Sequence, residues 1–77
     1  MKLEDEMQDL RRADEGIAAA RSRIERQFEL LRALEKDGHD TVLAEKLLAE
    51  MRQTLQAMIE YRETIAEAID KIRSKKL

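Results

Sequence analysis

Apolar residues recur along the first half of the chain at the spacing of one helical face. Leu3, Leu10, Ile17, Ile24 and Leu31 follow one another every seven residues. Further apolar residues fill the three- and four-residue offsets, namely Met7, Ala13, Ala20, Phe28 and Leu34. This period indicates an amphipathic helix rather than a strand. The pattern therefore predicts a first helix over residues 3–36.

The pattern stops at a short segment that carries the signals of a tight turn, residues 37–40. Gly38 can adopt the left-handed conformation that commonly ends a helix. Asp40 or Thr41 can then cap the next helix, because its side-chain oxygen can accept a free backbone N–H. A connection this short between two helices makes them antiparallel neighbours.

A second apolar face follows and predicts a helix over residues 41–74. Its members alternate at three and four residues: Ala44, Leu48, Met51, Leu55, Met58, Ile65, Ile69 and Ile72. Arg62 stands where this pattern expects an apolar residue. We therefore expect an all-α fold, a single antiparallel two-helix hairpin of coiled-coil type that occupies residues 1–77.

The apolar stripe on each helix is wider than one pair of helices can cover. At about 100° per residue the stripe spans roughly 160°, whereas a two-stranded coiled coil uses a narrow seam. Pairing of two hairpins into a four-helix bundle would cover the excess. A homodimer is therefore expected, with burial against a different protein as the alternative. The candidate interface residues lie beside the seam: Met7, Phe28, Leu30, Leu47, Ile59 and Tyr61.

The composition argues against most kinds of catalytic, metal and cofactor site. The 77 residues include no cysteine and one histidine, so disulfides, thiolate sites and an ordinary zinc site are not expected. No catalytic set, cofactor motif or glycine-rich loop is present, and we expect no enzyme activity and no cofactor. A net charge of -2 argues against nucleic-acid and anionic-membrane partners. No signal peptide or apolar span is apparent, and a cytoplasmic location is expected.

Folding at Gly38 places residues whose numbers add up to roughly 77 opposite each other. Arg62 then lies near Asp14, and an ion pair between them would fix the register of the two helices. A ligand-binding role for Arg62 is the alternative. The same rule sets Gly16 opposite Tyr61, as a notch for the ring. His39 is expected to be an exposed turn residue, although its two acidic neighbours also permit a metal or pH-sensing role.

One group of proteins shares part of this pattern, from about Ala20 to Ile69. The shared residues are Arg26-Gln27, Leu30-Leu31, Leu34-Glu35, Asp37-Gly38-His39-Asp40-Thr41, Ala44, Leu47-Leu48 and Tyr61-Arg62. On these residues the chain resembles small uncharacterised bacterial helical-hairpin proteins with an Asp-Gly-His-Asp-Thr turn. The resemblance implies a helical hairpin and no assigned activity. Tyr61 stands where that group often has a histidine.

The sequence thus favours a structural or protein-interaction module that self-associates and binds a larger protein. The alternative is a small inhibitor or adaptor that docks its apolar flank into a groove on an enzyme or regulator.

Overall fold

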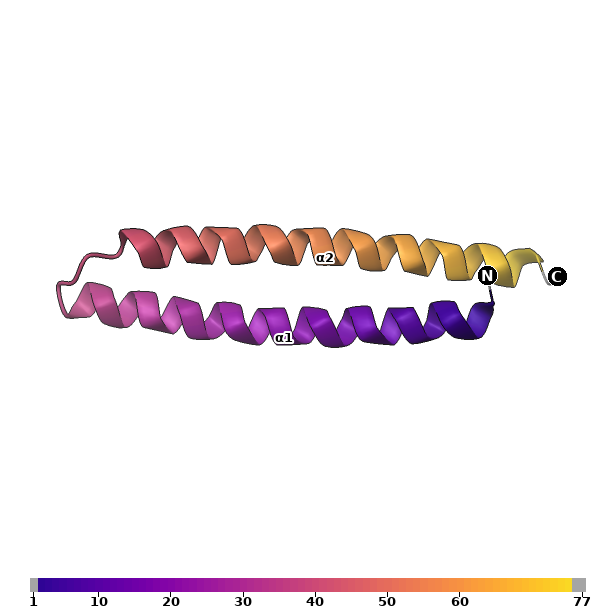
Figure 1. The fold of residues 1–77 in the computed structure, drawn as a ribbon, viewed down its shortest axis with the longest axis horizontal. Helices are drawn as coiled ribbons and strands as arrows, with labels where there is room; N and C mark the ends of the chain where they lie inside the picture. The colour runs from indigo at the N-terminus through magenta and orange to yellow at the C-terminus, as the bar shows by residue number, and fades with distance from the viewer. Residues whose placement is uncertain (1, 76–77) are drawn as a thin grey trace.

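The computed structural model describes residues 2–75, which form two long helices, α1 (Leu3–Lys36) and α2 (Val42–Lys75). Figure 1 shows the helices side by side and antiparallel, with the start of α1 and the end of α2 at one end of the rod. The Cα trace measures 61 by 15 by 14 Å, and no strand occurs between residues 2 and 75. The chain is an all-α helical hairpin, as the sequence predicts.

The end of α1 is shaped by Gly38, whose φ of 74° lies in the left-handed region. The His39 N–H donates to the Leu34 carbonyl at 2.9 Å, and the Gly38 N–H donates to the Glu35 carbonyl at 3.1 Å. These two bonds form a Schellman motif, which satisfies carbonyls that the helix end would leave free. A side chain at position 38 would be strained at this φ, because only glycine adopts it without cost.

The start of α2 differs by one residue from the sequence-based expectation, and so does its end. The Val42 N–H donates to the Asp40 carboxylate at 3.0 Å, while the Thr41 carbonyl accepts the first helical bond, from Glu45. Asp40 thus supplies the capping side chain and Thr41 stays outside the helix. The helix runs over Val42–Lys75 instead of 41–74.

The core is a single seam between the two helices. Its best-buried large side chains, 5–8% exposed, are Ile17, Leu31, Leu48, Ile65 and Ile69. No large side chain among residues 2–75 is completely buried. A two-helix seam leaves every core residue near an edge, so the hairpin has a thin core for a chain of this length.

Two polar residues occupy seam positions in the row formed by residues 6, 13, 20, 27 and 34. Gln27 is half-buried, and its Nε2 donates to the Ala44 carbonyl at 3.2 Å. Glu6 is only 3% exposed, and its Oε1 has no hydrogen-bond partner among the described residues. A buried oxygen without a partner costs stability, because it has lost its water.

The neighbour of Gly16 is Met58, and the expected pairing of Gly16 with Tyr61 across the hairpin is wrong. A Cβ built on Gly16 would lie 3.1 Å from the Met58 Cε. Tyr61 is 62% exposed. The glycine therefore makes room for a methionine of the seam, while the tyrosine ring stays on the surface.

Candidate protein-interaction site

Large apolar side chains are exposed along the whole hairpin. Leu47 is 47% exposed, Leu30 50% and Tyr61 62%. Met7 and Phe28 are also exposed, and Ile59 is half-buried. All six residues predicted for an interface thus present apolar surface outside the seam. Burial of apolar area is the main driving force of association, so these positions are the candidate contacts.

Two of the six residues line a shallow groove along one side of the hairpin, and a third lies on the same side, which we call the groove face. Two adjoining hollows form the groove and share Thr54 and Met58. Leu47 lines the hollow nearer the turn and Tyr61 the other. Arg23 lines the hollow nearer the turn. Leu30 lies one heptad after Arg23 and therefore on the same side of the hairpin. The remaining lining residues are Asp9, Arg12, Ala13, Ala20, Glu50, Met51 and Ala57.

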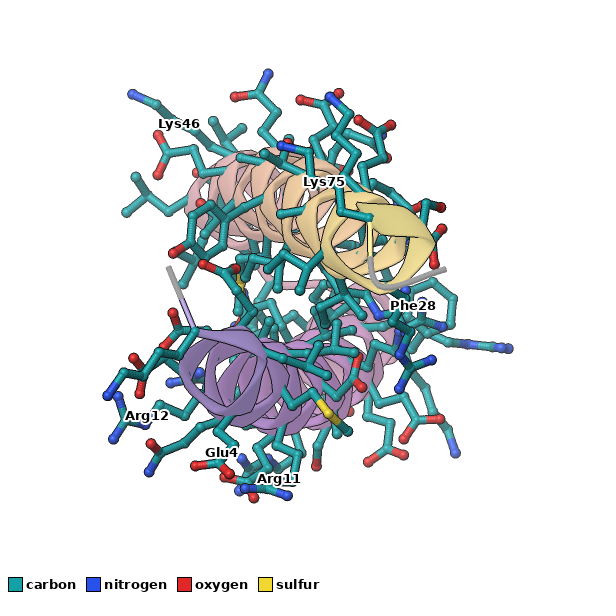
Figure 2. The ribbon with its side chains drawn as sticks, turned by 90° about the vertical axis from the view of Figure 1, so that its right-hand side faces the viewer. Glu4, Arg11, Arg12, Phe28, Lys46 and Lys75 are labelled. Carbon is teal, nitrogen blue, oxygen red and sulfur yellow. The ribbon has the colours of Figure 1, made fainter. Side chains whose placement is uncertain are left out.

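Met7, Phe28 and Ile59 belong to the other side, which we call the opposite face. Met7 Sδ lies 4.0 Å from an Arg73 guanidinium nitrogen, and Ile59 precedes Arg73 by two heptads. Phe28 follows Met7 by three heptads. Figure 2 shows Phe28 and the groove residue Arg12 on opposite sides of the hairpin. The six predicted residues therefore form two separate surfaces.

The opposite face also carries polar contacts that cross the hairpin. The Arg62 Nε donates to the Asp14 Oδ1 at 2.6 Å, and a second Arg62 nitrogen lies 3.6 Å from Glu63. The hydrogen bond to Asp14 is the main cause that raises the pKa of Arg62 above its usual value. The contact expected from the sequence is thus present. Its role in fixing the register stays a prediction.

The Asp14–Arg62 ion pair lies largely in contact with water. The Arg62 side chain is 34% exposed and the Asp14 side chain 52% exposed. Water therefore solvates both charges, and the ion pair contributes less than a buried one would. Arg62 nevertheless occupies a seam position, in the row of Leu48, Leu55 and Ile69.

We expect Arg62→Met to leave the urea midpoint unchanged or to raise it, because methionine restores an apolar seam residue. Asp14→Ala should lower the midpoint slightly in low salt, and the loss should disappear at 1 M NaCl, where an exposed pair is screened. Arg52→Met, at an exposed position of the same helix, is the control for replacing an arginine. A large loss of stability in Arg62→Met that persists in high salt would contradict this interpretation.

The turn histidine and the acidic residues do not form a metal centre in the part of the chain that is described. His39 is exposed, and no group of three or more His, Cys, Asp or Glu residues converges between residues 2 and 75. Over the same residues, neither helix has a stretch that is long and apolar enough to cross a membrane.

Sequence reasoning missed Glu6, because the search for apolar periodicity passed over a carboxylate. The signal was available: Glu6 precedes Ala13 and Ala20 by one and two heptads, and both alanines lie in the seam row. A heptad row assigned by spacing, whatever its residue types, would have placed Glu6 in the core.

Comparison with protein-family models, with curated proteins and with solved structures finds no match to this chain.

Proposed function

We propose that this protein is a non-enzymatic protein-interaction module. The hairpin pairs with a second copy to form a homodimeric four-helix bundle, and this dimer binds a larger protein. The observation that carries the proposal is the row of exposed large apolar side chains beside a thin seam, above all Leu30, Leu47 and Tyr61 on the groove face.

The stability of so thin a hairpin supports self-association. A chain of 77 residues without cysteine has no disulfide to compensate for a small core, and chains of this kind commonly gain stability from a partner chain. Each 100 Å² of apolar surface removed from water contributes about 2.5 kcal/mol. Covering the groove face would therefore add to the stability of the hairpin.

The opposite face favours a second candidate function, that of an inhibitor or adaptor. Met7, Phe28 and Ile59 remain exposed or half-buried there when the groove face is covered. Amphipathic helices commonly dock such residues into an apolar groove of another protein. In this role the apolar flank, rather than a bundle, would be the functional surface.

We expect the isolated protein to be a dimer at micromolar concentration, measured by size-exclusion chromatography with light scattering. Its melting temperature should rise with protein concentration, because dissociation is coupled to unfolding. A monomer whose melting temperature is independent of concentration would rule out self-association and leave the adaptor role as the better candidate.

A further inference from the structure

We infer that the groove face is covered by a second copy of this chain in parallel orientation, with the two turns at the same end of the bundle. This inference rests on the proposed self-association and specifies which surface and which orientation it uses. The charges along the two rims of the groove carry the argument.

The two rims are defined by heptad spacing from groove-lining residues. On α1 the rim contains Arg12, which lines the groove, with Asp5 one heptad before it and Arg26 two heptads after it. On α2 the rim contains Glu50, which also lines the groove, and Lys71 three heptads later. Each rim thus carries both signs of charge, in a fixed order along the rod.

The order on one rim is the reverse of the order on the other. Residues at the same level along the hairpin have numbers that add up to about 76, as those of Asp14 and Arg62 do. By this rule Asp5 is level with Lys71, and Arg26 is level with Glu50. Between these two levels, the uncharged Ala19 of the α1 rim is level with Ala57 of the α2 rim. Asp5 and Arg26 on the rim of α1 therefore each have an opposite charge at the same level on the rim of α2. Arg12 is the exception, because it is level with the uncharged Thr64.

These opposite charges do not neutralise each other inside the hairpin. The ion pairs within 4.0 Å among residues 2–75 are Asp9–Arg12, Asp14–Arg62 and Arg62–Glu63. Asp5, Arg26, Glu50 and Lys71 have no such partner in this range, since the groove separates the two rims. They remain available to a second molecule that covers the groove.

A parallel dimer uses these charges directly. A two-fold axis along the rod keeps each residue at its own level and brings α1 against α2 of the other copy. Arg26 then meets the partner's Glu50, and Asp5 meets the partner's Lys71, each twice by symmetry. An antiparallel dimer brings α1 against α1 instead. With the two grooves centred on each other, Arg12 would then lie opposite the partner's Arg26, and like charges would repel.

The apolar residues of the groove face agree with the parallel arrangement. Leu30 and Leu47 are level with each other near the turn, so Leu30 would pack on the partner's Leu47, and Leu47 on the partner's Leu30. Gly16 and Tyr61 are level near the middle of the rod. The exposed Tyr61 ring would therefore lie over the partner's α1 at the level of Gly16, where its apolar faces leave water.

The orientation can be measured with one spin label on the turn. The chain contains no cysteine, so His39→Cys carries a single label at an exposed position. In the parallel dimer the two turns are neighbours at helix-packing distance, and dipolar electron spin resonance should give a label separation below about 30 Å. In an antiparallel dimer with centred grooves, the rise of about 1.5 Å per residue separates the turns by about 55 Å.

The charge pairs can be tested by exchange. Arg26→Glu and Glu50→Arg should each weaken the dimer about tenfold, because each places like charges together twice. The double variant Arg26→Glu/Glu50→Arg should recover the dissociation constant of the parent. Glu67→Arg makes the same change of charge on an exposed part of α2 outside the groove, and it should alter the dissociation constant by less than about twofold. Helicity at 222 nm confirms that each variant is folded.

Each outcome decides the inference. A short label separation together with recovery in the double variant supports it. A dimer with a separation near 55 Å, or a double variant that binds no better than the single ones, overturns the parallel arrangement but leaves the proposed self-association standing. A parent protein that stays monomeric to millimolar concentration overturns both.

Discussion

Leu48→Asp is expected to abolish the cooperative folding of the hairpin. Leu48 is 5% exposed and lies in the seam close to the turn. The substitution removes one of the best-buried apolar side chains and places a carboxylate in the apolar seam, which costs about 4 kcal/mol or more. A single core of this size supplies about 3–5 kcal/mol. Circular dichroism at 222 nm should show a large loss of helix and no sigmoidal melting curve.

Leu43→Asp is the matched control. It is the same change on the same helix, but Leu43 is 81% exposed. It also lies in the first turn of α2, where the helix dipole favours a negative charge. The control should retain its helicity and its cooperative melting. If Leu48→Asp melted like Leu43→Asp, the seam described above would not be the core of the protein.

The heptad pattern was sufficient to predict the seam. Burial of apolar residues spaced alternately three and four apart is the main contribution to the stability of a helical pair. The turn was also predictable, since Gly38 and Asp40 each supply a specific local contact, a left-handed backbone and a capping oxygen. These signals act over a few residues and depend little on the rest of the chain. They therefore appear in the sequence without knowledge of the fold.

The arrangement of the candidate interface was not predictable in the same way. At 100° per residue a seven-residue repeat drifts by about 20° per heptad, whereas the helices of a coiled coil bend to keep the seam in contact. On a straight helix Met7 and Leu30 therefore fall within one broad stripe. In the structure they lie on opposite sides of the seam, on the opposite face and the groove face. Contacts across the hairpin, such as Gly16 with Met58, depend on the same bending.

Glu6→Leu is expected to stabilise the protein by about 1–3 kcal/mol. Glu6 is 3% exposed, and its Oε1 accepts no hydrogen bond from residues 2–75. Leucine would remove a buried oxygen without a partner, which costs about 1–3 kcal/mol, and would add apolar burial to the seam. The lost attraction between the carboxylate and the start of α1 offsets up to about 1 kcal/mol of this gain. Urea unfolding at one fixed protein concentration measures the difference.

Two variants separate burial from the other consequences of this change. Glu15→Leu makes the same substitution at an exposed position of α1, so it shares the gain in helix propensity but not the burial, and its midpoint should change little. Glu6→Gln removes the charge and keeps a polar side chain, so it should lie between the parent and Glu6→Leu. A Glu6→Leu protein less stable than the parent would show that the Glu6 carboxylate makes a favourable interaction in solution. Burial of a leucine between the helices is itself favourable. A loss of stability would therefore mean that the Glu6 carboxylate stabilises this end of the seam.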